Sequence, residues 1–422
     1  MGLYMTDNSE NTAQGNTVDS SADIHRSEII SDLLEKGPVT SVRNEESAGD
    51  LDGPCFFFAG GGTGGHIYPA IAVAEQIRKL HPDSKLTFFC SGRTIDSHIL
   101  KGSGYDYITL PASGLSANPV GMFRFISGFF KSRKSSHSVM SLQSRRAALI
   151  SVGGFVSAGP VLAAKKLGIP IVIINVDYVP GKANRRLAKY ADEIFVQFPE
   201  TKKYFGRSQK KITVSGCPLR DNFDFPIPDN AVRDLDLDKN KKVLLIIGGS
   251  SGAQTLNNAM MLMFPALACF ASSWQIVHIT GKYNYQQVRA AYTNATVEHK
   301  IVDYYNNMAD LYAASDLLIG RAGGVSIAEY AASGLPAICL PYPHHKDNHQ
   351  YLNAKPLVEA GAALIVDDNS KDCVATSKKL LEAVLPLMKN EEKRNQMSAA
   401  AKKLAAPQPA GQIAQSVIEM LP

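Results

Sequence analysis

Short apolar segments that end in glycine-rich loops, each followed by an amphipathic segment, recur four times along this chain. The first, CFFFAGGGTGGHIYPAIAVAEQI at 55–77, sets five glycines and a histidine between a strand pattern and a helix pattern. Apolar strands that alternate with amphipathic helices predict a parallel sheet covered on both faces. Glycine lets the backbone approach a ligand closely, and the start of a helix directs N–H groups at one point, which suits a phosphate. For any single loop, a tight turn without a ligand is the alternative.

The pattern runs through the chain twice, which predicts an α/β fold of two Rossmann-like domains facing each other across a cleft. We expect an N-terminal domain over 54–218, a polar linker rich in Pro and Asp over 219–242, and a C-terminal domain over 243–400. A final helix over 401–422 could return to the N-terminal domain. Residues 1–53 are polar and acidic and are predicted to be a disordered extension.

Composition is that of a soluble enzyme, with 45% hydrophobic and 20% charged residues among 422. The chain contains no run of eighteen apolar residues, so no membrane-spanning helix is predicted. The six cysteines are scattered without a CxxC pair, so we expect reduced core residues and neither disulfides nor a zinc site. The first fifty residues hold ten acidic and three basic side chains, which leaves a net charge of +12 on the rest. That charge favours an anionic partner, and without an RNA-binding or helix-turn-helix motif we expect no nucleic acid.

The four glycine loops lie at 60–66, 153–160, 248–253 and 321–329, two in each half. None fits GxGxxG with an acidic residue about twenty positions later, which disfavours a nicotinamide dinucleotide, and none fits the P-loop pattern. Each loop falls at the carboxyl end of a predicted strand, so the two pairs predict two anionic binding sites across one cleft. No DxD-like motif adjoins them, and we expect no metal and no cofactor.

Five motifs in this order carry a resemblance: GGGTGGH, GGFVSAGP, GGSSGA, RAGGVSIAE and PYPHHKDNHQYLNA. Over residues 54–420 the chain resembles the MurG family of N-acetylglucosaminyltransferases, which convert lipid I to lipid II in peptidoglycan synthesis. The resemblance implies a GT-B fold and an inverting, metal-independent transfer from UDP-N-acetylglucosamine to a lipid-linked acceptor, at the cytoplasmic face of the inner membrane. Three alternatives stay open: a transferase with a different lipid or natural-product acceptor, a UDP-N-acetylglucosamine 2-epimerase, and a non-catalytic nucleotide-binding paralogue.

The resemblance also implies which residues meet the donor. Backbone and hydroxyl donors near Ser250 and at the helix start of Val325 and Ser326 would receive the UDP phosphates, and Glu329 would accept from the ribose hydroxyls. From the residues alone, Glu329 could instead be an acidic group stabilised by the helix dipole. The full set of expected UDP-sugar contacts is Thr63, Gly64, Gly65, Asp177, Arg220, Ser250, Tyr305, Val325, Ser326, Glu329, Gln350 and Asn353.

Within that set, Tyr305 corresponds to a uracil-contacting residue and Arg220 to an arginine that reaches the donor across the linker. Gln350 and Asn353 correspond to residues that read the sugar hydroxyls. The alternatives are a solvated linker charge for Arg220 and helix-capping amides for Gln350 and Asn353.

The first two loops are expected to hold the diphosphate of the acceptor. His66 is the one titratable side chain in the first loop and therefore a candidate base, while a neutral histidine that packs the loop is the alternative. The expected contacts of the acceptor diphosphate are Gly61, Gly62, Thr63, Gly64, Gly65, Gly153, Gly154 and Ser157.

At INVD, residues 174–177, the chain departs from the family. Asn175 stands where the family has Glu, Asp177 stands where it has Asn, and His349 replaces a Gln. Asp177 is therefore a second catalytic candidate, which either supports the reaction or marks a changed acceptor.

The segment 118–136 predicts an interfacial helix on an anionic membrane surface, with a core helix and basic tail as the alternative. Its apolar residues lie near one helical face and basic residues flank them. The apolar set is Met122, Phe125, Ile126, Phe129 and Phe130, and the basic set is Arg124, Lys131, Arg133 and Lys134.

Overall fold

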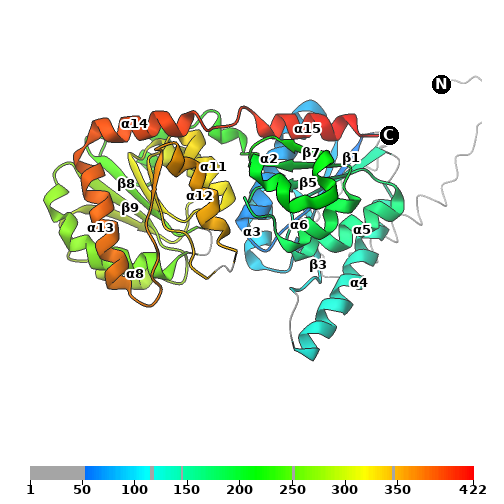
Figure 1. The fold of residues 1–422 in the computed structure, drawn as a ribbon, viewed down its shortest axis with the longest axis horizontal. Coiled ribbons are helices and arrows are strands. Elements are labelled where there is room, and N and C mark those ends of the chain that lie inside the picture. The colour runs from blue at the N-terminus through cyan, green and yellow to red at the C-terminus, as the bar shows by residue number, and fades with distance from the viewer. Residues whose placement is uncertain (1–52, 115–117, 144–145, 250–251, 345–346) are drawn as a thin grey trace, which may run out of the picture.

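The computed structural model describes residues 53–114, 118–143, 146–249, 252–344 and 347–422. The predicted disordered extension lies, apart from its last residue, outside the described residues. Two parallel sheets form two domains, with strand orders β3-β2-β1-β4-β5-β6-β7 and β10-β9-β8-β11-β12-β13 (Figure 1). Both contain the 3-2-1-4-5-6 order of a dinucleotide-binding fold. The prediction of an α/β fold with two Rossmann-like domains is confirmed.

The N-terminal sheet has buried central strands because helices cover both of its faces. Phe56 and Phe58 point to one face and Phe57 to the other, and all three are fully buried in two separate core clusters. The strands are β1 (Cys55–Ala59), β2 (Lys85–Ser91), β3 (Asp106–Leu110), β4 (Ala147–Ser151), β5 (Ile171–Asn175), β6 (Glu193–Val196) and β7 (Ile212–Val214). The helices are α2 (Gly64–Leu80), α3 (Thr94–Ser103), α4 (Pro119–Ser141), α5 (Ala158–Leu167) and α6 (Lys182–Leu187), with 3₁₀ segments η2 (Phe155–Ser157), η3 (Ala188–Tyr190) and η4 (Pro199–Lys211).

The C-terminal sheet repeats the arrangement. Its strands are β8 (Lys242–Ile247), β9 (Trp274–Ile279), β10 (Glu298–Val302), β11 (Leu317–Gly320), β12 (Ala337–Cys339) and β13 (Ala363–Ile365). The helices are α7 (Pro228–Asp234), α8 (Gln254–Met263), α9 (Tyr285–Ala291), α10 (Met308–Ala313), α11 (Gly324–Ser333), α12 (His349–Glu359), α13 (Cys373–Lys389) and α14 (Glu391–Lys402), with 3₁₀ segments η5 (Asp221–Phe223) and η6 (Phe264–Phe270).

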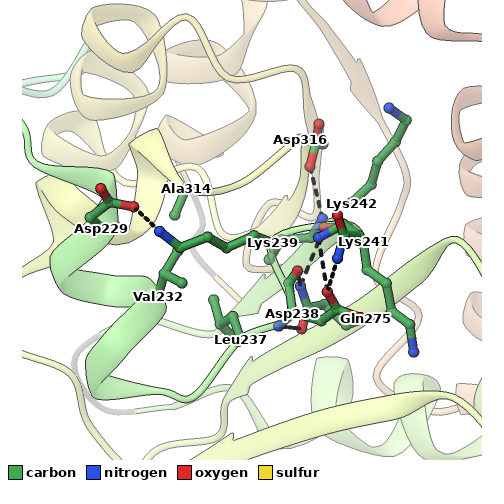
Figure 2. Close-up of a pocket in the computed structure, with 12 residues that line it drawn as sticks. Asp229, Val232, Leu237, Asp238, Lys239, Lys241, Lys242, Gln275, Ala314 and Asp316 are labelled. Atoms are coloured by element: carbon green, nitrogen blue, oxygen red, sulfur yellow. Dashed lines mark hydrogen bonds and ion pairs between the residues drawn. The ribbon is translucent and has the colours of Figure 1, made fainter.

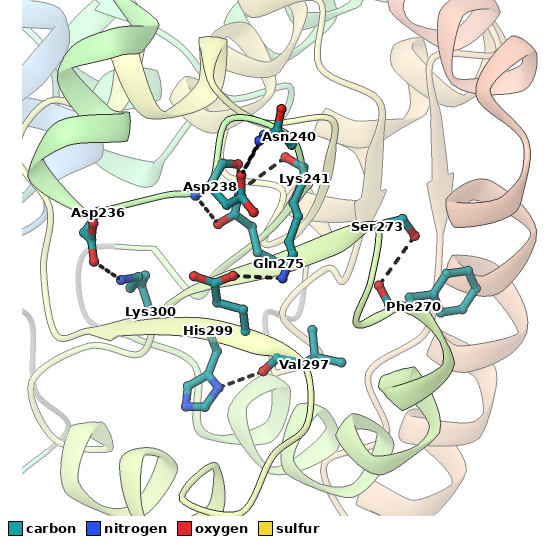
Figure 3. Close-up of polar contacts among 11 residues, drawn as sticks. Asp236, Asp238, Asn240, Lys241, Phe270, Ser273, Gln275, Val297, His299 and Lys300 are labelled. Carbon is teal, nitrogen blue, oxygen red and sulfur yellow. Dashed lines mark hydrogen bonds and ion pairs between the residues drawn. The ribbon is translucent and has the colours of Figure 1, made fainter.

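The second half of the expected linker is part of the C-terminal domain. Ala231 of α7 is fully buried in that core, and Leu235 and Leu237 pack beside it. Polar contacts hold the following turn to the amino ends of the strands, where Asp238 N–H donates to Gln275 Oε1 at 3.0 Å and Lys300 pairs with Asp236 at 3.0 Å (Figure 3). Residues 228–242 therefore move with the C-terminal domain.

The last helix, α15 (Pro409–Glu419), lies over the N-terminal domain, whereas α14 lies over the C-terminal domain (Figure 1). Ile413, Ala414 and Val417 of α15 are fully buried in the same core cluster as residues of α2. The chain thus crosses between the domains twice, once at the linker and once between α14 and α15.

Four cysteines are buried and unpaired, as expected of reduced core residues: Cys55, Cys90, Cys217 and Cys339. The expectation is wrong for Cys269, which is exposed, and Cys373 is only half-buried. Cys269 lies within the 3₁₀ segment η6 and Cys373 is the first residue of α13, and in helical segments a single apolar position does not determine which face is buried.

Candidate active site

The glycine loops follow neighbouring strands in each sheet. The first and second loops follow β1 and β4, which pair in parallel, and the third and fourth follow β8 and β11, which also pair. These are the points where the strand order reverses, which is where parallel α/β sheets bind their ligands. The two edges meet, because a Cβ built on Gly324 of the fourth loop would lie only 2.4 Å from the Val176 carbonyl after β5. The site therefore lies between the domains.

A buried aspartate binds the backbone of the first loop. Asp96 is fully buried and accepts from the Gly62 N–H at 2.9 and 2.8 Å and from the Ser91 N–H at 3.0 Å. The Gly62 N–H is therefore already bound within the protein, and the expected contact of Gly62 with the acceptor diphosphate stays a prediction. Sequence reasoning missed Asp96, which lies 34 positions away from Gly62.

The remaining backbone N–H groups of the first loop, at the start of α2, have the arrangement that binds an anion. Thr63 precedes α2 without capping it through its side chain, and Gly64 and Gly65 form the first turn. The N–H groups at a helix start without a side-chain cap are available to a ligand or to water.

The second loop packs directly on the first. Gly153 and Gly154 have φ of +100° and +82°, and a Cβ on Gly154 would lie 2.8 Å from the Gly61 carbonyl. Ser157 is fully buried, and its hydroxyl faces the carbonyls of Gly153 at 2.7 Å and Ala59 at 3.0 Å. Ser157 therefore holds the second loop to β1, and its expected contact with the acceptor diphosphate stays a prediction.

His66 lies where the two loops meet. Its Nδ1 is 3.2 Å from Thr63 Oγ1, and a Cβ on Gly154 would lie 3.7 Å from the same nitrogen. Burial lowers the pKa of His66 below the ordinary histidine value, and the negative charge of Asp177 opposes that shift. A neutral imidazole in this position can accept a proton.

Asp177 and Asn353 join the two domains. Asn353 is fully buried and uses Nδ2 to donate to Asp177 Oδ1 at 3.0 Å and to the Ala322 carbonyl at 3.1 Å. Its Oδ1 accepts from the Tyr178 N–H at 2.8 Å. Both amide hydrogens of Asn353 are thus bound within the protein, so its expected contact with sugar hydroxyls requires these bonds to change.

Glu329 is a buried carboxyl on α11. Burial raises its pKa to about 7, against the opposing effects of Arg220 and of the hydrogen bond that Tyr312 donates to Glu329 Oε2 at 3.2 Å. Arg220 also lies over the Tyr68 ring at 4.3 Å. The structure thereby brings together Arg220 and Glu329, two of the residues that the sequence placed at the donor.

The remaining donor candidates have other contacts. Val325 packs into the N-terminal core cluster, and Ser326 beside it is half-buried on α11. The Tyr305 hydroxyl donates to Asp234 Oδ2 of α7 at 3.0 Å, and Gln350 Oε1 accepts from the Tyr342 N–H at 2.9 Å. Ser250 lies outside the described residues.

Arg321, the first residue of the fourth motif, had no predicted role. It pairs with the buried Asp368 at 2.7 Å and donates to Thr255 Oγ1 at 2.8 Å and to the Leu340 carbonyl at 3.0 Å. Because Thr255 lies in the first turn of α8, Arg321 ties the fourth loop to the start of the helix that follows the third loop.

Helix α4 projects from the N-terminal domain (Figure 1), and its projecting end carries exposed apolar side chains. Phe123 is 72% exposed and Phe130 is 58% exposed, whereas Phe125 and Phe129 are half-buried. The apolar end of this helix is therefore exposed, whereas Gly128, Ser132, Ser136 and Met140 in its later turns are buried, so the interfacial helix stays a prediction. Across the described part of the chain, no helix is long and apolar enough to cross a membrane.

A hollow of about 390 Å³ lies at the amino ends of β8 and β11, on the opposite edge from the glycine loops (Figure 2). Its charges pair internally: Lys239 with Asp229 at 2.9 Å, and Asp316 with the Val243 N–H at 2.8 Å. Because these groups already have partners, the hollow does not direct hydrogen-bond donors at a ligand. The sheet edges that carry the glycine loops therefore remain the candidate site. Among the described residues no cluster of three or more His, Cys, Asp or Glu side chains could hold a metal.

Two Rossmann-like domains whose switch-point loops meet around a histidine, with a buried glutamate on the facing helix, define the GT-B class of sugar-nucleotide enzymes. The glycosyltransferase family 28 N-terminal domain matches residues 56–196, and the family 28 C-terminal domain matches residues 243–413. The chain belongs to glycosyltransferase family 28.

Known proteins agree with this assignment. The UDP-N-acetylglucosamine–N-acetylmuramyl-(pentapeptide) pyrophosphoryl-undecaprenol N-acetylglucosamine transferase of Halothermothrix orenii is 34% identical, over 83% of this chain and 94% of its own. The crystal structure of Acinetobacter baumannii MurG has a TM-score of 0.64 at 24% identity, over 87% of this chain and all of its own. The UDP-GlcNAc 2-epimerase of Neisseria meningitidis, bound to UDP-GlcNAc, has a TM-score of 0.63 at 16% identity, over 86% of this chain and all of its own, which shows a shared fold.

Proposed function

We propose that this glycosyltransferase moves N-acetylglucosamine from UDP-N-acetylglucosamine to a lipid-linked muramoyl-pentapeptide, the step from lipid I to lipid II. Curated relatives that carry this activity in their names are 31–34% identical over most of the chain. The structural observation that carries the proposal is the contact between Gly324 and Val176, which sets the loops of β1 and β4 opposite those of β8 and β11.

The donor would occupy the C-terminal half of this interface. The start of α11 has no side-chain cap, so its N–H groups and its dipole suit the diphosphate of UDP. Glu329, one turn further along α11, would accept from the ribose hydroxyls. These same dipoles would stabilise the charge that develops on UDP as it leaves, usually a large contribution to catalysis in such sites.

The acceptor hydroxyl would attack the anomeric carbon from the N-terminal side. The glycosidic bond forms as the bond from that carbon to the UDP oxygen breaks, which inverts the configuration. The hydroxyl proton would pass to His66, whose lowered pKa keeps it neutral, and the Asp177 charge would stabilise the imidazolium that results.

The membrane partner would be an anionic surface on the cytoplasmic side, where the lipid-linked acceptor would be reached by a peripheral protein. Support comes from α4, whose apolar end is exposed and whose flank carries Arg124, Lys131 and Lys134, each exposed to solvent. Exposed aromatics beside basic residues bind the interface between headgroups and acyl chains.

Labelled UDP-N-acetylglucosamine, incubated with and without lipid I, tests the activity. Transfer requires the acceptor and yields a labelled lipid, whereas a 2-epimerase would convert the sugar nucleotide without an acceptor. Epimerisation, or no reaction in either arm, would contradict the proposal. The epimerase alternative is not favoured, because the epimerase structures share only 14–16% identity with the chain.

A further inference from the structure

The first glycine loop has a negative charge directly beneath it. Asp96 contacts only donors, the Gly62 and Ser91 N–H groups and the Ser91 hydroxyl, as suits a carboxylate. Gly61 lies so close that a Cβ there would be 2.4 Å from Asp96 Oδ2. A diphosphate bound over this loop would be repelled by Asp96 and would lack the Gly62 N–H, so its binding requires a nearby cation.

Arg93 supplies a cation at this position. Its Nη1 donates to the Gly62 carbonyl at 2.7 Å, although the side chain is exposed at the rim of the loop. Among the described residues no other hydrogen bond from the guanidinium is formed, which leaves further N–H donors directed at solvent. A guanidinium binds phosphate oxygens through paired N–H groups, a geometry that a lysine does not offer.

Arg93 also touches the second loop. Its guanidinium lies 5.6 Å from the centre of the Phe155 ring, the aromatic residue of GGFVSAGP. Phe155 in turn lines a small crevice of about 10 Å³ together with Phe125 and Phe129 of α4. Phe155 therefore lies next to both the guanidinium and the helix whose far end is exposed and apolar.

We propose that Arg93 binds the diphosphate of the lipid-linked acceptor between the first two loops, and that the polyprenyl chain leaves over Phe155 toward α4. The inference rests on the proposed function, because it takes the acceptor to be a polyprenyl diphosphate. It assigns the contact with the diphosphate to Arg93 and the contact with the polyprenyl chain to Phe155. The two contacts can therefore be measured separately, with one ligand that is a diphosphate alone and another that also carries a prenyl chain.

Binding of farnesyl diphosphate and of inorganic pyrophosphate, measured by calorimetry, tests the assignment. Arg93→Ala should weaken both by roughly 10- to 150-fold, while Arg93→Lys should recover part of the loss. Phe155→Ala should weaken farnesyl diphosphate and leave pyrophosphate unchanged. Arg289→Ala, which removes an equally exposed arginine from α9, is the matched control and should change neither. Affinity for UDP-N-acetylglucosamine should stay constant in all four variants.

Wild-type affinity for farnesyl diphosphate in Arg93→Ala would overturn the inference. So would an equal loss in Arg289→Ala, since the effect would then be one of net charge. The proposed function fails separately: wild-type protein that transfers no sugar to lipid I refutes it, whereas transfer with an unchanged acceptor KM in Arg93→Ala refutes only the role of Arg93.

Discussion

Asp177 of the N-terminal domain accepts a hydrogen bond from the side-chain amide of Asn353 in the C-terminal domain, with 3.0 Å between Oδ1 and Nδ2. The same aspartate raises the pKa of His66 against the effect of burial. One side chain thus holds the domain interface and acts electrostatically on the candidate base. An asparagine at this position would provide the first contact but not the second.

Asp177→Asn separates these two effects, because the amide oxygen can still accept from Asn353 while the charge is lost. We expect kcat to fall about 10²- to 10⁴-fold, the range of a general base or its charge partner, with unchanged UDP affinity. Without the negative charge the pKa of His66 falls, so the acidic limb of the kcat/KM profile should move to lower pH. A rise in activity on lipid I would instead mark Asp177 as a determinant of acceptor choice. Unchanged rate, pH profile and acceptor preference would make it a bystander.

Donor binding should depend on the ionisation of Glu329. Burial raises its pKa to about 7, and ribose hydroxyls donate best to the ionised carboxylate. Affinity for UDP-N-acetylglucosamine should therefore rise up to tenfold per unit as pH increases toward 7 and level off above it. Glu329→Gln should abolish this dependence, and Glu329→Ala should bind roughly 10- to 150-fold more weakly at pH 8. Calorimetric affinities that are equal in wild type and Glu329→Ala would remove Glu329 from the site.

Membrane binding should depend on the end of α4. Phe123 and Phe130 are the exposed aromatics there, so changing both to Ser should lower co-sedimentation with phosphatidylglycerol vesicles by about 10- to 100-fold. Binding by the wild type should weaken with added salt, because the basic flank contributes through screened charges. Phe225→Ser is the control, since Phe225 is 85% exposed but lies in the linker. Equal losses in Phe225→Ser, or wild-type binding that ignores salt, would refute the role of α4.

The features that repeat locally were predictable, and those that depend on distant partners were not. The alternation of strand, glycine loop and helix determines both sheets, because parallel strands buried on two faces need continuous apolar runs. The hydrogen bond between Asp96 and Gly62 could not be found this way, since it joins the first turn of α3 to a loop 34 positions earlier. The periodicity of α4 predicted its exposed aromatic residues only in part, because Phe125 and Phe129 are half-buried while Phe123, outside the predicted set, is 72% exposed. The polar sequence around α7 concealed Ala231, a single small residue that the C-terminal core buries completely.

The buried His278 gives the C-terminal domain a pH-dependent stability. It lies on β9, where Nε2 contacts Asn257 Oδ1 at 3.0 Å and Nδ1 contacts the Tyr292 hydroxyl at 3.1 Å. Because an amide oxygen only accepts, Nε2 carries a proton, and burial keeps the ring neutral by lowering its pKa. Burial lowers its pKa to about 3, whereas the unfolded chain protonates this residue near pH 6.5.

Replacing His278 with Phe should therefore destabilise the domain by an amount that changes with pH. Above pH 7 the loss should be about 2–5 kcal/mol, because Asn257 and Tyr292 each keep a buried polar group without its partner. Below pH 6.5 the unfolded wild type gains a proton that the folded state does not bind, which lowers wild-type stability by about 1.4 kcal/mol per pH unit until the folded pKa is reached. The variant lacks this contribution, so the difference between the two proteins should shrink from pH 7 to pH 4. Urea unfolding followed by the fluorescence of Trp274, the single tryptophan and itself buried on β9, measures it directly. A difference that stays constant over this range would show that His278 is not held neutral in the folded domain.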